Sequence, residues 1–208
     1  METSMFDYII IGGGSAGCVL AARLSEDPDI RVCLLEAGPV DKSVLIHCPA
    51  GLALLAKNGQ ANWAFETVPQ PGLNGRRGYQ PRGKVLGGSS SINAMIYSRG
   101  HPSDYDYWAA QGNPGWSFDE VLPYFRRSEH NERGADAWHG AGGPLNVADL
   151  RSPNRFGPVF VRAGREAGFA VNHDFNGAEQ EGVGMYQVTH KNGERFSAAK
   201  AYLTPNLS

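Results

Sequence analysis

Three glycines and one acidic residue form the pattern with the clearest chemical meaning. Gly12, Gly14 and Gly17 follow the G-x-G-x-x-G spacing, and Glu36 lies 19 positions after Gly17 (36 − 17 = 19). Glycines at this spacing permit a sharp turn, let the backbone approach a pyrophosphate and let a helix pack closely on the preceding strand. An acidic residue about 20 positions further on accepts hydrogen bonds from an adenosine ribose. The pattern predicts a dinucleotide site; the alternative is a glycine-rich turn with a surface glutamate.

The flanking residues predict the elements that such a site needs. The apolar run at residues 7–11 is typical of a strand buried on both faces, and residues 31–35 predict a second such strand that ends at Glu36. Helical apolar spacing covers residues 15–24. This β-α-β order places the free N–H groups and partial positive charge of a helix start beside the glycines. The context therefore favours the dinucleotide site over a plain turn.

A second glycine segment lies at residues 82–93, which read RGKVLGGSSSIN. Gly87 and Gly88 permit a sharp turn, and the serines at 89–91 are suitable N-cap residues for a helix that continues through residues 94–96. Two helix starts that can each bind an anion could hold opposite ends of a long, phosphate-bearing cofactor. The alternative is an ordinary serine-capped helix after a glycine turn.

The glycine fingerprint alone does not separate a nicotinamide from a flavin cofactor. Residues 39–80 are rich in Gly, Pro, Asn and Gln and replace the third βα unit of a simple dinucleotide fold. No tyrosine is followed four places later by lysine, the pair expected of a short-chain dehydrogenase. An NAD-dependent dehydrogenase and a non-catalytic nucleotide-binding module remain as alternatives to a flavoenzyme.

Composition limits the class of protein. The 208 residues carry 19 Lys plus Arg against 21 Asp plus Glu, a balance that argues against nucleic acid or an anionic membrane as the main partner. Glycine is in excess, at 27 residues (27/208 ≈ 13%) against about 7% usually, which indicates many tight turns. No apolar run approaches the ~18 residues that a transmembrane helix needs, so no transmembrane segment is expected.

Neither a disulfide framework nor a metal site is supported. The three cysteines, Cys18, Cys33 and Cys48, lack CxxC spacing and are expected to be reduced and mostly buried, and the six histidines contain no HExxH pair. The start, METSMFDYIII, has an acidic Glu2 and no basic flank, unlike a secretion signal. The expected location is cytoplasmic.

Together, the segments DYIIIGGGSAG, LLEAG, ETVPQ, RGKVLGGSSSINAMIYSRG and DYDYW resemble the N-terminal part of the glucose-methanol-choline (GMC) oxidoreductase family, particularly its choline and alcohol dehydrogenase branch. The resemblance runs from about residue 6 to the end and includes RFSAAKAYLTP. It implies an α/β, Rossmann-like FAD-binding fold, incomplete at the C-terminus. It also implies an FAD-binding domain over residues 1–150, with an inserted lid or loop region at about 39–80, and the start of a substrate domain with a return segment over 151–208.

The resemblance implies an FAD-dependent enzyme that oxidises choline or another primary alcohol by hydride transfer to the flavin N5. The cofactor-binding residues it implies are Gly12, Gly14, Ser15, Gly17, Glu36, Ala37, Val85, Gly87, Gly88, Asn93, Ala94, Met95 and Ile96. Trp63 is expected either near the cofactor lid or in the core. Some relatives attach FAD covalently through a histidine where this chain has Ile92, so FAD is expected to bind non-covalently.

No catalytic residue can be assigned in this chain. In the family a histidine near the C-terminus takes the hydroxyl proton, and no position here matches it. His101 and His139 lie in polar, glycine-rich segments and are expected to be surface or turn residues, while Asp104 and Asp106 are expected helix-start acids. The chain is therefore expected to be an N-terminal fragment that is inactive by itself.

The resemblance leaves the electron acceptor open among oxygen, a quinone and another carrier. Peripheral membrane association through that acceptor is left open as well. Towards the end of the chain, residues 152–168 predict an amphipathic helix that begins after Pro153, and residues 174–184 predict a loop.

Overall fold

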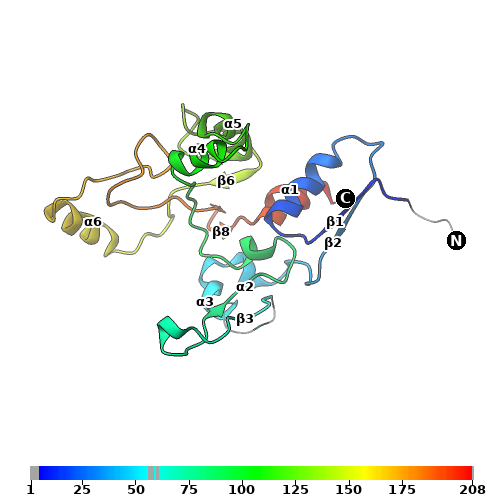
Figure 1. Cartoon of the computed structure of the whole chain (residues 1–208), viewed down its shortest axis with the longest axis horizontal. Helices are drawn as coiled ribbons and strands as arrows, with labels where there is room; N and C mark the ends of the chain where they lie inside the picture. The colour runs from blue at the N-terminus through cyan, green and yellow to red at the C-terminus, as the bar shows by residue number, and fades with distance from the viewer. Residues whose placement is uncertain (1–4, 56–58, 60, 208) are drawn as a thin grey trace. The chain divides into compact units, whose positions relative to one another are not determined.

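The computed structural model describes residues 5–55, 59 and 61–207. The chain forms two compact units (Figure 1). Unit 1 comprises Met1–Met95 and Asn192–Ser208, and unit 2 comprises Ile96–Lys191. The expected functional boundary at residue 150 falls inside unit 2 and stays a prediction. Glu2, on which the expected absence of a secretion signal partly depends, lies outside the described residues.

Unit 1 contains the predicted β-α-β arrangement. Strand β1 (Tyr8–Ile11), helix α1 (Ser15–Leu24) and strand β2 (Val32–Leu35) follow one another, and the two strands pair in parallel. The N–H of Gly12 donates to the carbonyl of Leu35 at 2.7 Å, which carries the pairing into the glycine turn. The sequence prediction of these three elements is confirmed.

The predicted burial of both strand faces is wrong for β1, and in β2 the residues are half-buried or, at Leu35, exposed. Ile10 is buried and lies against Gly17 of α1, whereas Ile9 and Ile11 on the opposite face are 62% and 88% exposed. Side chains alternate between the two faces of a strand, so a single covering helix buries only every second one. The apolar run therefore predicted the strand correctly, but not the burial of both of its faces.

The predicted insertion at 39–80 contains only short elements within its described part. They are α2 (Val44–His47), the 3-10 turn η1 (Pro49–Gly51), α3 (Leu52–Leu55), the strands β3 (Phe65–Glu66) and β4 (Tyr79–Gln80), which pair antiparallel, and the 3-10 turn η2 (Pro71–Leu73) between them. A small hydrophobic core joins this region to the second glycine segment through Ile46, Leu55, Ala61, Val85 and Ile92.

The predicted helix after Gly88 is wrong. The segment forms a single 3-10 turn, η3 (Gly88–Ser91), and Met95 further on has a φ of +63°, which no right-handed helix contains. The Ser91 hydroxyl donates to the carbonyl of Leu86 instead of capping a helix start. The Asn93 side chain accepts from the Met95 N–H, a local bond that competes with helix formation.

The end of the chain belongs to unit 1. Strand β8 (Glu194–Arg195) is followed by the helical turns η4 (Ala199–Leu203) and η5 (Thr204–Asn206). Figure 1 shows this segment, in red, alongside α1, and η4 packs against that helix. The segment expected to return towards the nucleotide-binding region therefore packs on the helix of the first glycine motif.

Unit 2 contains short helices and strands. They are α4 (Pro102–Ala110), α5 (Phe118–Ser128), β5 (Glu129–Asn131) paired in parallel with β6 (Leu145–Val147), α6 (Gly157–Glu166) and β7 (His190–Lys191). Helix α6 begins at Gly157, later than predicted, and residues 174–184 form no helix or strand, as predicted. None of the helices in the described ranges is both long and apolar enough to span a bilayer.

The expected helix-start acids take two different positions. Asp104 accepts from the His101 N–H at 2.8 Å and completes a capping box at the start of α4, while His101 is an exposed N-cap residue. Asp106 instead accepts from the N–H of Phe118, the first residue of α5, at 3.0 Å. Both acids therefore stabilise helix starts, but Asp106 serves the next helix rather than its own.

Candidate functional site

Unit 1 contains a cavity of about 770 Å³ at the carboxyl ends of β1 and β2. It is lined by Ile11, Gly12, Gly14, Ser15, Leu35, Glu36, Ala37, Trp63, Phe65, Arg82, Gly83, Gly88 and Ser89. Ligands of open α/β sheets bind outside the carboxyl ends of the strands, where the helices begin. The cavity is therefore the candidate site, and six predicted residues line it: Gly12, Gly14, Ser15, Glu36, Ala37 and Gly88.

The two glycine segments lie in direct contact at this cavity. The Gly87 N–H donates to the carbonyl of Gly13 at 2.7 Å. A Cβ added to Gly88, whose φ is +56°, would lie 2.7 Å from the Cα of Gly14. The prediction that the segments hold opposite ends of a ligand stays a prediction, and the structure adds that the segments meet at the cavity. They form one continuous wall, and only glycine permits the approach.

The start of α1 is open to an anion. Its N-cap residue, Gly14, makes no side-chain capping bond, and no acidic residue lies in the first turn, so the first N–H groups of the helix keep their capacity to donate. A Cβ at Gly17 would lie 2.0 Å from the Gly12 carbonyl oxygen, so this glycine is required for the helix to pack on the turn. The thiol of Cys18 donates to the Gly13 carbonyl, and burial raises the pKa of this thiol to about 11.

Glu36 is held in place by the backbone on both sides of it. One carboxylate oxygen accepts from the Gly13 N–H and the other from the Gly38 N–H, both at 2.8 Å. Each carboxylate oxygen can accept a further hydrogen bond. The group is thus fixed at the end of β2 with acceptor capacity left for a ligand hydroxyl.

An aromatic wall closes one side of the cavity. Trp63 and Phe65 stack with ring centroids 5.7 Å apart, and the Lys84 ammonium lies 4.4 Å from the centroid of the Trp63 ring. Trp63 is 44% exposed and lines the cavity, so it is not a core residue, and its expected place near the cofactor lid stays a prediction. A flat ring system and a diphosphate both fit this lining, because it combines aromatic faces with an uncapped helix start.

The other predicted residues lie behind or beyond the cavity wall. Val85 is fully buried in the hydrophobic core, and Asn93 and Ala94 are exposed. Met95 is buried in unit 1, whereas Ile96 is exposed and belongs to unit 2. Sequence reasoning missed Arg82, Gly83 and Phe65 as lining residues. A signal existed for the first two, since they are the first residues of the second glycine segment.

The predicted state of the cysteines is confirmed in part. All three are free, but Cys18 is buried, Cys33 is half-buried and Cys48 is exposed, so the expectation of mostly buried thiols is wrong. Cys48 lies between α2 and η1, at the surface of the insertion.

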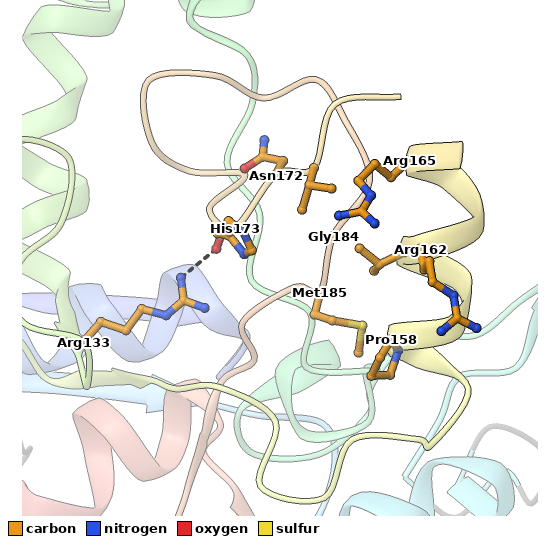
Figure 2. Close-up of a pocket in the computed structure, with 10 residues that line it drawn as sticks. Arg133, Pro158, Arg162, Arg165, Asn172, His173, Gly184 and Met185 are labelled. Atoms are coloured by element: carbon orange, nitrogen blue, oxygen red, sulfur yellow. Dashed lines mark hydrogen bonds between the residues drawn. The ribbon is translucent and has the colours of Figure 1, made fainter. Parts of the chain in front are cut away.

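A second cavity, of about 530 Å³, lies in unit 2 between α6 and residues 171–185 (Figure 2). The side chains of Arg133 and Arg165 approach it from opposite sides. Arg133 donates to the His173 carbonyl at 2.7 Å and pairs with Asp149 at 2.7 Å, so part of this positive charge is already satisfied. None of the predicted site residues lines this cavity.

Unit 2 also contains a buried ionic cluster around His139. The prediction that His139 is a surface or turn residue is wrong, because it is 4% exposed. Its Nδ1 lies 3.0 Å from Glu129 Oε1 and its Nε2 lies 2.9 Å from Asp174 Oδ2. Arg99 Nη2 lies 2.8 Å from the other oxygen of Glu129, which is fully buried. The polar sequence around His139 conceals its burial because its partners lie far away in the chain.

The cluster shifts the pKa values of its members. Hydrogen bonds to Asp174 and Glu129 raise the pKa of His139 to about 9. Burial alone would raise the pKa of Glu129, but the bonds from His139 and the Gly140 N–H, with the charge of Arg99, lower it below its usual value. The bond from His139 likewise lowers the pKa of Asp174. The imidazolium and both carboxylates are therefore charged at neutral pH.

These shifts predict how the stability of unit 2 depends on pH. The raised pKa of His139 contributes stability that is fully present below its ordinary value of 6.5 and is lost as pH rises towards about 9. The lowered pKa values of Glu129 and Asp174 contribute stability that is lost as pH falls below their ordinary values. Melting temperatures measured from pH 6 to 10 should decline through this window. The decline should flatten in His139→Gln; an equal slope in both proteins would contradict the assignment.

Comparisons with known proteins agree with this geometry. The family model described as GMC oxidoreductase matches residues 6–208. The chain is 56% identical to alcohol dehydrogenase (acceptor) of Pseudomonas putida, covering 98% of this chain and 38% of that protein. It is 50% identical to the oxygen-dependent choline dehydrogenase of Sinorhizobium fredii, covering 97% of this chain and 37% of that protein.

Solved structures show the same fold. Pyridoxine 4-oxidase from Mesorbium loti superposes with a TM-score of 0.91 at 40% identity, over 96% of this chain and 40% of that one. An FAD-dependent oxidoreductase from Chaetomium thermophilum gives a TM-score of 0.85 at 32% identity, over 95% of this chain and 36% of that one. The chain thus spans well under half the length of these relatives. It belongs to the GMC oxidoreductase family.

Proposed function

We propose that the cavity of unit 1 binds FAD and that the chain is the FAD-binding part of an alcohol-oxidising flavoprotein. The contact between the Gly12–Gly17 turn and the Gly87–Gly88 turn carries this proposal. This contact forms one wall of the cavity beside the uncapped start of α1. The chain also belongs to a family whose solved relatives include an FAD-dependent enzyme. The NAD-dependent alternative has no comparable support.

The lining suggests a role for each part of the wall. Gly12, Gly14 and Ser15 would hold the diphosphate through backbone N–H groups at the start of α1. Glu36 would accept hydrogen bonds from the adenosine ribose, and Ala37 would lie beside it. Gly87, Gly88, Asn93, Ala94 and Met95 of the second segment would support the ribityl chain and isoalloxazine, and Val85 would act from the core behind the wall. The expected role of Ile96, which belongs to unit 2, stays a prediction. Gly17 would act through packing alone.

The bound flavin would supply the acceptor for a hydride from the alcohol. The residues of this chain would bind and orient it, and they include no assigned base: no histidine lines the cavity among the described residues. General-base catalysis needs such a group within hydrogen-bond reach of the substrate. We therefore propose that the proton is taken by a residue outside this chain, and that choline or another primary alcohol is the substrate. The identity of the final electron acceptor is left open among oxygen, a quinone and another carrier. The cytoplasmic location and the domain division at residue 150 stay predictions.

A titration of the full chain with FAD tests the proposal. Flavin fluorescence should change saturably with one equivalent of FAD, and NAD should give no competing effect. Binding of NAD in preference to FAD would contradict the proposal. Dye reduction with choline or a primary alcohol should stay at background for this chain, and alcohol-dependent turnover would show that the base is present.

Non-covalent attachment gives a separate prediction. Ile92, at the position where a covalent histidine would stand, is a buried aliphatic residue of the hydrophobic core and offers no nucleophile. Acid precipitation of the FAD-loaded chain should therefore release all of the yellow colour into the supernatant. The control is a matched sample that is filtered without acid and keeps its flavin. Colour that stays in the acid pellet would show a covalent bond.

A further inference from the structure

Arg195 is a buried arginine that bonds to backbone and amide oxygens. Its side chain is 1% exposed. Nε donates to the carbonyl of Ile46 at 2.8 Å. Nη1 donates to the carbonyl and to the side-chain oxygen of Asn93, both at 2.7 Å, and lies 3.3 Å from the carbonyl of Ser90. One side chain thus joins α2 to the residues that follow the second glycine turn.

The turn that Arg195 holds is part of the cavity wall. The Ser90 hydroxyl donates to the carbonyl of Gly87 at 2.6 Å and accepts from the N–H of Ala198 at 2.9 Å. Gly87 in turn donates to Gly13. A continuous set of hydrogen bonds therefore runs from the segment 195–198 through the second glycine turn to the first.

This arrangement costs free energy. No ion pair of Arg195 is present among the described residues, and its Nη2 is buried without a hydrogen-bond partner in them. Burial lowers the pKa of Arg195 to about 10, so the guanidinium is still charged at neutral pH. A buried charge without a counterion is unfavourable, and an apolar side chain would fill the space at lower cost. A buried arginine that lowers stability is explained if it is needed to hold the turn in the geometry of the site.

We propose that Arg195 is a positioning residue for the cofactor cavity, because its planar guanidinium bridges Ile46, Ser90 and Asn93 and so fixes the second glycine turn against the first. The inference rests on the proposed function, since it assumes that the cavity binds FAD. It concerns a residue that lines no part of the cavity. A lysine cannot replace it, because an ammonium lacks the fixed fork of donors.

The experiment compares Arg195→Ala and Arg195→Lys with the parent in the full chain. FAD affinity should fall roughly tenfold or more in Arg195→Ala, the scale of hydrogen bonds to a charged group. Arg195→Lys should recover little of it. Guanidinium ion at low millimolar concentration should restore affinity in Arg195→Ala and leave the parent unchanged. Loss of affinity in Arg195→Ala that guanidinium ion does not restore would contradict the role given to the guanidinium group.

A matched control lies in the same segment. Lys200 pairs with Glu194 at the surface, so Lys200→Met removes one positive charge without touching the turn and should bind FAD like the parent. Equal FAD affinity in Arg195→Ala and the parent would overturn the inference.

Hydrogen exchange of the apo chain tests the geometry without the cofactor. Amides of residues 87–93 should exchange faster in Arg195→Lys, which is expected to keep the fold, than in the parent and in Lys200→Met. If no variant binds FAD, including the parent, the proposed function fails, and this exchange result still decides the role of Arg195. Unchanged exchange at 87–93 would overturn it.

Discussion

Gly88→Val should abolish measurable FAD binding, with affinity reduced about a hundredfold or more. The added Cβ would lie 2.7 Å from the Gly14 Cα, a backbone atom that cannot rotate away. The φ of +56° at this position is also unfavourable for a β-branched residue, at a cost of about 1–3 kcal/mol. The two glycine turns would have to separate, and the wall of the cavity would open. Fluorescence titration with FAD measures the effect.

Gly75→Val is the matched control. Gly75 has a φ of +74° and open space around its Cβ position, so the same substitution brings similar backbone strain but no contact with the first glycine turn. It should lower stability and keep FAD affinity within about threefold of the parent. If Gly88→Val binds FAD as well as Gly75→Val does, the contact between the two turns is not what forms the site.

Glu129→Gln should destabilise unit 2 by about 3–5 kcal/mol, the cost of breaking a buried ion pair by removing one partner. The substitution leaves Arg99 and protonated His139 buried beside a neutral amide, and the carboxylate's bonds to both are lost or weakened. The melting temperature should fall by more than about 10 °C. Differential scanning calorimetry of the full chain at pH 7 gives the measurement.

A surface glutamate provides the comparison for this prediction. Glu166 lies on α6, and the side chains of Glu166 and of its neighbour Arg162 are largely exposed. Glu166→Gln should change stability by no more than about 0.5 kcal/mol. Equal melting temperatures for Glu129→Gln and Glu166→Gln would show that the buried cluster contributes no more than a surface pair.

Helix α1 and the two strands around it could be predicted because their signals are local. The apolar period of residues 15–24 and the glycine spacing before it depend only on neighbours in the chain. The helix predicted after Gly88 does not form, in part because of contacts that the local sequence does not display. The guanidinium of Arg195, which lies 102 residues further along the chain, donates a hydrogen bond to the Asn93 carbonyl, and Met95 adopts a left-handed backbone conformation. Tertiary contacts override local propensity at such a turn.

His139 shows the same limit in unit 2. A histidine among glycines and polar residues is typical of a surface turn. His139 is nevertheless buried, and its hydrogen bonds to Glu129 and Asp174, which lie 10 and 35 residues away in the chain, favour its charged form. Which residues pair in this way depends on which distant segments the fold brings together, and residue types alone do not indicate that.

The sequence by itself determined the family, the β-α-β unit and the glycines that let a backbone approach an anion, because each depends on residue types at fixed short spacing. The tertiary structure decided that the two glycine turns touch, that Trp63 and Arg82 complete the cavity, and that Arg195 holds the second turn. These features join residues far apart in the chain, so packing and the satisfaction of buried polar groups, and not local preference, determine them.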